Sequence, residues 1–307
     1  MIRVCVICIV VLKFLFVAPL IVAQENGFTS LEGPYLGQEP PGITPEVFGP
    51  GVISVEENFE HSAAVFSPDG TVVFWCTNVD WYTEKRQTGM LRLYFMKMIN
   101  GKWTAPRIAP FAKDIRVERP TFSPDGNRLY FESFSNPNNM DDLDIFVVER
   151  NGETWSDPEP LSSVINTSAI ERIHCFTGDG SFYFSRNPFT RSEEIFVSKW
   201  VDGKFTEPEK LGNDYNSDYY EGVILISPNE EYMLIGQIDT QHSSPELKIS
   251  YKQADGSWSD RIKTPYHCGG FLALSPDGKY LFMLEEGIYW VSTSFAEYLM
   301  PMQENTD

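Results

Sequence analysis

The chain has 307 residues and a formal net charge of −19, from 43 acidic against 24 basic residues. This acidic balance excludes proteins that bind nucleic acid through a basic face, because such binding depends on neutralising phosphates. Aromatic residues make up 14% of the chain, with 22 glycines and 21 prolines. Many aromatic residues together with many turn formers favour short strands over helices.

The first 23 residues are expected to be a secretory signal peptide. Arg3 and Lys13 are the only charged residues there, and an apolar run from Phe14 to Val22 leads to a cleavage site after Ala23. The alternative is an uncleaved membrane anchor, because an apolar segment also lies between Arg3 and Lys13. We therefore expect a secreted or periplasmic protein, in contact with a membrane only if this segment stays uncleaved.

The rest of the chain is expected to form a Pro- and Gly-rich lead over 24–44, a single domain over 45–300 and a tail over 301–307. After the signal, three cysteines remain at positions 76, 175 and 268. An odd number in an exported protein leaves at least one unpaired. Small buried hydrophobic residues are one interpretation. A disulfide between Cys76 and Cys268 is the other, if the first and last repeats are neighbours.

One turn motif recurs five times in the domain, at steps of 56, 54, 50 and 48 residues. Its copies lie at 65–70, 121–126, 175–180, 225–230 and 273–278. Three copies end in Ser-Pro-Asp-Gly, in which Ser accepts hydrogen bonds, Pro fixes φ and Gly takes the positive φ that closes a hairpin. Glu230 replaces this Gly in the fourth copy, where a left-handed residue would cost about 1–2 kcal/mol. A different turn is expected there.

A second turn follows the third strand of the first four repeats. These Asx-Gly pairs predict two-residue hairpins with positive φ at both positions: Asn100-Gly101, Asn151-Gly152, Asp202-Gly203 and Asp255-Gly256. Each repeat is therefore a four-stranded antiparallel meander of about fifty residues. Such sheets bury both faces when they pack against one another around an axis. The sequence therefore predicts an all-β fold, a β-propeller. Five repeats are counted, and six blades are possible.

The fifth repeat lacks its fourth strand. No Asx-Gly turn follows the strand predicted at 288–292, whereas the segment 45–53 resembles the fourth strands of the other repeats. We expect this N-terminal strand to complete the last blade and close the ring.

These repeats resemble the WD-like, PD-type β-propeller repeat of TolB and of the propeller domains of prolyl oligopeptidase relatives. The resemblance covers about residues 45–295 and implies a propeller fold without indicating a function. The α/β-hydrolase domain of the prolyl oligopeptidase relatives carries a Gly-x-Ser-x-Gly motif, which this sequence lacks.

Charged residues stand where the innermost strand of a blade would start, at the mouth of the central channel. They occur in four of the five repeats: Glu60 and His61; Arg116, Glu118 and Arg119; Glu171 and Arg172; Glu221. One interpretation is a site for a polar ligand, and the other is a set of structural Glu–Arg pairs. The alternating signs argue against a metal, which would need acids without arginines.

The sequence predicts an exported, non-catalytic binding module with a protein or carbohydrate ligand. Trp81 and Tyr82, on a long loop, are candidate contacts, because loops on a rigid scaffold often bind ligands. The alternative is a glycan-active enzyme that uses two channel carboxylates, with Glu118 and Glu171 as first choices. No metal-ligand spacing and no phosphate loop occur, so no cofactor and no nucleotide are expected. Asn166 begins a glycosylation sequon.

Overall fold

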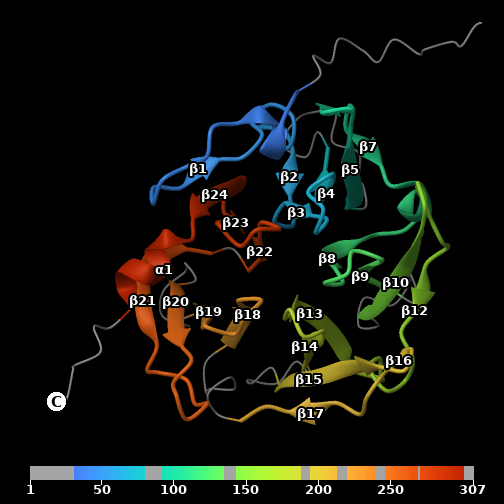
Figure 1. Cartoon of the computed structure of the whole chain (residues 1–307). Coiled ribbons are helices and arrows are strands. Elements are labelled where there is room, and N and C mark those ends of the chain that lie inside the picture. The colour runs from blue at the N-terminus through green and yellow to red at the C-terminus, as the bar shows by residue number, and fades with distance from the viewer. Residues whose placement is uncertain are drawn as a thin grey trace, which may run out of the picture.

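The computed structural model describes residues 31–79, 91–134, 143–187, 194–212, 220–238, 246–268 and 270–300, with backbone alone at 187, 220–223, 237 and 238. The chain forms a five-bladed β-propeller, in which antiparallel four-stranded blades follow one another around a ring (Figure 1). Five blades, and not six, account for the repeats. The first strand of each blade lies at the axis, as the sequence predicts.

The first three blades share one plan, in which the fourth strand is split into two short pieces. Blade 1 contains β2 (Phe59–Glu60), β3 (Val65–Phe66), β4 (Val72–Asn78), β5 (Arg92–Ile99), β6 (Lys102–Trp103) and β7 (Arg107–Ile108). Blade 2 contains β8 (Glu118–Phe122), β9 (Arg128–Phe134), β10 (Leu143–Asn151), β11 (Thr154–Trp155) and β12 (Glu159–Pro160). Blade 3 contains β13 (Ile170–Phe176), β14 (Ser181–Asn187), β15 (Glu194–Val201), β16 (Lys204–Phe205) and β17 (Glu209–Lys210).

The last two blades have unsplit strands. Blade 4 contains β18 (Tyr220–Ile226), β19 (Tyr232–Ile238), β20 (Glu246–Tyr251) and β21 (Ile262–His267). Blade 5 contains β22 (Leu272–Leu274), β23 (Tyr280–Leu284), β24 (Ile288–Ser292) and β1 (Glu46–Val47). The helical segments are η1 (Pro34–Gly37), η2 (Pro110–Ala112) and α1 (Ser294–Leu299). Within the described ranges, no helix has the length and apolar content needed to cross a membrane.

The recurring turn is held together by its own side chains. In blade 2, Ser123 Oγ donates to Asp125 Oδ1 at 2.5 Å, and the backbone N–H of Arg128 donates to the same Ser123 Oγ at 3.0 Å. Asp125 in turn accepts the backbone N–H of Asn127 at 3.0 Å. The Gly that ends each of the four Gly-containing copies has a φ between +69° and +83°. The motif therefore specifies one turn geometry by local hydrogen bonds.

The expectation of a different turn in blade 4 was wrong. Glu230 adopts a left-handed φ of +58°, and its N–H donates to the carbonyl of Ser227 at 2.8 Å as in the other copies. The N–H of Tyr232 also donates to Ser227 Oγ at 3.1 Å. The hydrogen bonds of the turn and the pairing of its two strands therefore outweigh the strain at Glu230.

The Asx-Gly turns form two classes. Asn100-Gly101 and Asp202-Gly203 have positive φ at both positions, as expected. In blade 2 the pair Asn151↔Thr154 closes the hairpin one residue later, so only Gly152 is left-handed. Near Asp255 the N–H of Gly256 donates to the carbonyl of Gln253, which gives a longer turn. The prediction of two positive φ values is therefore wrong for the second and fourth repeats.

The N-terminal strand closes the ring, as the sequence predicts. β1 pairs antiparallel with β24 through Glu46↔Trp290 and Val47↔Tyr289, and the two strands lie side by side in Figure 1. Phe48 follows β1, is fully buried, and places its ring 4.9 Å from Phe282 and 5.2 Å from Trp290. The core of blade 5 therefore depends on residues from both ends of the domain.

All three described cysteines are free thiols in the core. Ring closure makes blades 1 and 5 neighbours, but Cys76 and Cys268 are not bonded to each other, so the disulfide alternative is wrong. Burial raises the pKa of the Cys268 thiol to about 11, so it is un-ionised and unreactive at neutral pH.

Replacing Phe48 tests ring closure by side-chain packing. Phe48→Ala should lower the free energy of unfolding by about 3–5 kcal/mol, because it leaves a cavity among Phe66, Phe282 and Trp290. Urea denaturation followed by tryptophan fluorescence measures this change. Glu46→Ala, at an exposed residue of the adjoining strand β1, is the matched control and should change stability by less than about 0.5 kcal/mol. Equal effects of the two substitutions would contradict closure through Phe48.

Removing the strain at Glu230 should stabilise the protein. Glu230→Gly is expected to raise the free energy of unfolding by about 1 kcal/mol, because glycine adopts the left-handed conformation without steric cost. The partly exposed ion pair with Lys252, at 3.6 Å, offsets little of this gain. Gly278→Ala, at φ +71° with open space around its new methyl group, should lose about 1 kcal/mol. A destabilised Glu230→Gly variant in thermal denaturation would argue against strain at this position.

Candidate functional site

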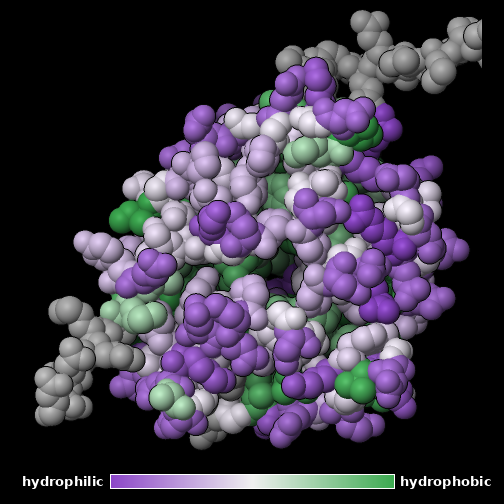
Figure 2. Space-filling view, in the orientation of Figure 1, coloured by the Kyte–Doolittle hydropathy of each residue, from purple (hydrophilic) through white to green (hydrophobic). Residues whose placement is uncertain are grey.

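The candidate site lies at the end of the channel where the inner strands begin. Figure 2 shows one face of the ring, with a hollow at its centre and mostly hydrophilic side chains on the blades around it. Residues of β8 and β13, and residues next to β2, bring charged side chains to this end of the channel. The channel end is therefore polar, whereas the interfaces between blades are apolar.

Glu118 is the centre of an ion-pair network between blades 1 and 2. Its Oε1 accepts from Arg116 Nε at 2.6 Å and Nη2 at 2.5 Å, and its Oε2 lies 3.5 Å from His61 Nε2. Burial by itself would raise the pKa of this carboxyl group. The hydrogen bond from His61 and the charge of Arg116 outweigh that effect and hold the pKa at about 2. Glu118 is therefore ionised at neutral pH and oriented by both partners.

Arg119 stands at an irregular point of β8. Its φ is +47°, and the register of β8 on β9 shifts between Glu118 and Thr121, which marks a β-bulge. The guanidinium lies 4.4 Å from the ring centre of Phe271 in blade 5, and Nε lies 3.4 Å from Glu132 Oε1. Bulges and left-handed non-glycine residues occur preferentially at functional sites, where they re-aim a side chain.

Glu132 is a site residue that the sequence interpretation missed. It projects from the second strand of blade 2, has 1% exposure, and accepts the backbone N–H of Ile173 in blade 3 at 2.8 Å. Its Oε2 is buried without a hydrogen-bond partner in the described part of the chain. Burial raises its pKa to about 7, and the charges of Arg119 and Arg172 only partly oppose this rise. The sequence signal was a single acid among the buried residues of β9.

Glu171 is fully buried at the start of β13. Its Oε1 accepts from Thr167 Oγ1 at 2.6 Å and lies 3.5 Å from Arg186 Nε, while Arg186 also donates to the carbonyl of Ile165 at 3.0 Å. Burial raises the pKa of Glu171. Arg186 was not among the predicted residues, because it lies on the second strand of its blade, like Glu132.

The remaining predicted residues have different positions. Glu60 is buried, and its carboxylate accepts the backbone N–H of Val55 at 3.1 Å. His61 places its ring 4.9 Å from that of Phe271, which brings it close to Arg119. Glu221 lies in β18, where only the backbone is described, and Trp81 and Tyr82 lie outside the described residues.

The asparagine of the glycosylation sequon is buried in the fold, while the two residues that follow it are exposed. Asn166 is 8% exposed, its Oδ1 accepts the N–H of Ile145 at 3.0 Å, and its Nδ2 donates to the carbonyls of Ile145 and Leu161. Attachment of a sugar would break these bonds, so Asn166 is a structural residue in the folded chain. In the described ranges, no cluster of three His, Cys, Asp or Glu side chains is arranged to hold a metal ion.

Comparison with known proteins extends this picture only at the level of fold. The sequence matches no protein-family model and no curated protein. Among solved structures it is similar to the periplasmic gluconolactonase of Pseudomonas aeruginosa, with 11% identity and a TM-score of 0.41 over 72% of this chain and 77% of that chain. An oligogalacturonate lyase in complex with manganese has 12% identity and a TM-score of 0.44, over 77% and 66% of the two chains.

Prolyl oligopeptidase B from Galerina marginata has 15% identity and a TM-score of 0.42 over 72% of this chain. Here the similarity spans only 30% of that longer chain. At these identities the similarity concerns the propeller fold alone.

The pKa of Glu132 gives the protein a defined pH dependence. The folded chain keeps Glu132 protonated up to about pH 7, whereas the ordinary value of 4.5 applies after unfolding. Its contribution to stability therefore falls as the pH rises from about 4.5 to 7. Relative to the wild type, Glu132→Gln should gain up to about 3 kcal/mol across this window. Urea denaturation at both ends of the window measures the gain.

Asp69→Asn, in the recurring turn of blade 1, is the control for this experiment. Hydrogen bonds from Ser67 and Thr71 outweigh the effect of burial and hold the pKa of Asp69 at about 2, so its effect on stability is already complete above the ordinary value of 3.8. The stability difference between Asp69→Asn and the wild type should stay constant across the window. The same constant difference for Glu132→Gln would show that Glu132 does not titrate as a buried neutral acid.

Proposed function

We propose that this chain is an exported β-propeller that acts as a binding module, and that its ligand docks at the charged end of the central channel. The ligand is a glycan or a segment of another protein outside the cytoplasm. The observation that carries the proposal is the network of His61, Arg116 and Glu118, whose side chains are 26%, 31% and 13% exposed. These groups are oriented by one another and still accessible from solvent.

The energetics of the network favour a binding role over a purely structural one. Burying an ion pair, such as Arg119 with Glu132 beside this network, contributes little net stability, and apolar residues of similar volume often stabilise a core more. Arg119 adds backbone strain at the same place, and strain of this kind persists where function requires it. The cost of burying the ion pair and the backbone strain at Arg119 are both explained if the charged groups bind a ligand.

The charge balance indicates the kind of ligand. Arg116 belongs to the network, and the charges of Arg119 and Arg172 act on Glu132, which interacts with Glu118. Arg186 pairs with Glu171 in blade 3, and burial raises the pKa values of both Glu132 and Glu171. These arginines suit a ligand with acidic or hydroxyl groups.

Aromatic rings next to these charges favour a glycan. The Arg116 guanidinium lies 5.6 Å from the ring centre of Phe134, and the Phe59 ring lies 5.4 Å from that of His61. Binding sites of small molecules commonly combine apolar rings with a few fixed polar groups. Here the rings can contact the faces of sugars, while the arginines and Glu118 can bind their hydroxyl or carboxylate groups.

One observation supports a second candidate, a glycan-active enzyme. Glu118 and Glu132 lie in one electrostatic network, and their pKa values are driven apart to about 2 and about 7. Such a difference is typical of carboxylate pairs that divide the roles of base and acid. Glu118 and Glu171, the first choices from sequence, are each paired with an arginine, Arg116 and Arg186. We therefore favour binding over catalysis.

We also propose a family relationship and a cellular location for the protein. The five Ser-Pro-Asp-Gly-like turns support kinship with the TolB-like propellers, and the apolar segment ending at Ala23 supports export to a secreted or periplasmic location. An exported propeller of this kind would present its charged channel end to ligands outside the cytoplasm.

A glycan array probed with the chain from residue 24 onward tests the proposed function. We expect binding to a restricted set of glycans, and a loss of roughly tenfold or more in affinity for Arg116→Ala, because one charge-assisted contact is removed. Lys102→Ala is the control, since Lys102 is exposed on the outer strand β6 and pairs with Glu32 there. It should leave affinity unchanged.

The outcomes separate the two candidates. Unchanged affinity of Arg116→Ala for the selected glycans would overturn the proposed site. Mass spectrometry of glycans incubated with the protein tests for hydrolysis. If the protein hydrolyses glycans, and Glu132→Gln loses hydrolysis while it still binds them, the protein is a glycan-active enzyme and not a binding module.

A further inference from the structure

Glu118 and Glu132 stand opposite each other on two neighbouring strands of blade 2. The register of β8 on β9 pairs Glu118 directly with Glu132. Side chains at directly opposite positions of an antiparallel pair lie on the same face of the sheet, with their Cβ atoms about 4.5–5.5 Å apart. Like charges at such positions repel each other, so the pairing disfavours the state in which both carboxyl groups are ionised.

The surroundings of the two carboxyl groups decide which of them stays ionised. Glu118 is held by the Arg116 guanidinium at Oε1, and its Oε2 lies beside His61. Glu132 is fully buried, and only its Oε1 lies near a positive charge, at 3.4 Å from Arg119 Nε. Its Oε2 has no hydrogen-bond partner within the described ranges, although a buried ionised carboxylate needs donors at both oxygens. The proton of the pair therefore resides on Glu132.

Glu132 is surrounded by ionisable groups from three strands. Arg119 on β8 and Arg172 on β13 favour its ionised form, and Glu118 on β8 opposes it. The thiol of Cys76 on β4 also interacts with Glu132, and burial raises the pKa of this thiol, so it stays neutral. Burial outweighs the two arginines and raises the pKa of Glu132 to about 7. Glu132 therefore gains or loses its proton near neutral pH when the charge around it changes.

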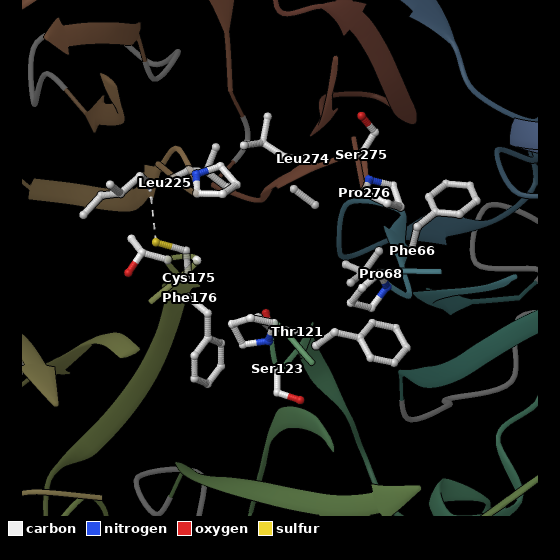
Figure 3. Close-up of a pocket in the computed structure, with 18 of the residues that line it drawn as sticks. Phe66, Pro68, Thr121, Ser123, Cys175, Phe176, Leu225, Leu274, Ser275 and Pro276 are labelled. Carbon is white, nitrogen blue, oxygen red and sulfur yellow. Dashed lines mark hydrogen bonds between the residues drawn. The ribbon is translucent and has the colours of Figure 1, made fainter. Parts of the chain in front are cut away.

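The two ends of the channel differ in their chemistry. A cavity of about 340 Å³ lies at the other end, where the inner strands run into the recurring turns, and Figure 3 shows its side chains arranged around an open centre. Among the described residues, the lining of this cavity has no Asp, Glu, Lys or Arg side chain. An acidic ligand is therefore expected at the charged end, next to Arg116, and not among the turns.

Arg116 can bind an acidic ligand while it holds Glu118. A guanidinium has five N–H donors in a planar fork, and the bonds to Glu118 come from Nε and Nη2. The side chain is 31% exposed, so a ligand carboxylate can approach it from solvent. Such a ligand adds a negative charge beside Glu118 and Glu132, which favours the neutral form of Glu132.

We propose that the charged end of the channel binds glycans that contain uronic acids, and that the glycan binds together with one proton, which Glu132 takes up from solvent. This inference rests on the binding function proposed above and names its ligand class and its control by pH. The ligand carboxylate binds Arg116, and the proton on Glu132 removes a negative charge from the group. By linkage, the affinity should fall as rising pH removes the proton from Glu132.

Isothermal titration calorimetry with a hyaluronan hexasaccharide tests the proposal on the chain from residue 24 onward. Titrations in two buffers of different ionisation enthalpy count the protons taken up on binding. We expect proton uptake at about pH 7.5, and roughly tenfold weaker binding at about pH 8.5 than at about pH 5.5. The same hexasaccharide with methyl-esterified carboxyl groups is the neutral match. It should bind roughly tenfold more weakly at the lower pH.

Two variants identify the group that takes up the proton. Glu132→Gln keeps the shape of the side chain but cannot ionise, so its affinity should be the same at both pH values and its binding should take up no proton. His61→Gln removes the other titratable partner of Glu118 and should leave the proton uptake in place, although it alters the site itself. Circular dichroism checks that both variants are folded.

The outcomes separate this inference from the function on which it rests. Binding of the hexasaccharide without proton uptake would overturn the linkage and leave the binding module intact. Proton uptake that persists in Glu132→Gln and is lost in His61→Gln would do the same. A glycan array on which only neutral glycans bind, or no binding of the hexasaccharide, would overturn the acidic ligand class. A chain that binds no glycan on the array would overturn both proposals.

Discussion

The pairing of β1 with β24 is the constraint on which the rest of the structure depends. A propeller blade buries its faces only against its two neighbours, so an open ring would leave two apolar faces exposed to water. The pair Glu46↔Trp290 and the buried Phe48 join the N-terminal segment to the last blade. Closure fixes the distance of every inner strand from the axis, and with it the width of the channel.

Within the closed ring, irregular inner strands determine what the channel contains. β8, β13 and β18 each show a register shift, at Arg119, His174 and Gly222. A regular strand alternates its side chains strictly, whereas a bulge changes their direction at one point. Arg119 thereby reaches Glu132 at the charged end, and His174 lines the apolar cavity at the other. The bulge in β8 thus helps to position the charged groups of the proposed site.

The sequence predicted the architecture because its signals are local and repeated. Five copies of one turn identified the blades, and the missing fourth strand of the last repeat identified β1 as its replacement. Glu230 was mispredicted because the hydrogen bonds of Ser227 and the strand pairing outweigh an unfavourable φ. Turn propensity is a statement about one residue, while the turn is held by several.

The candidate site was only partly predictable, because its pairings join residues from different blades. The starts of inner strands pointed to Arg116, Glu118 and His61, which do form one network. Glu132 and Arg186 were missed because they project from second strands, where a single charge in an apolar run gives no indication of its partner. The hydrogen bond that His174 Nδ1 accepts from the N–H of Ile224 joins residues fifty positions apart, which no local pattern reveals.

Amide hydrogen exchange of the full chain is the most direct test of the closed ring. The N–H of Phe48 donates to the carbonyl of Ile288 at 2.8 Å, which places it inside the cooperative unit. If β1 closes the ring, this amide exchanges only on global unfolding, at the same rate as the amides of β4 and β23. Rapid exchange at Phe48, with β4 and β23 still protected, would show that the ring does not depend on β1.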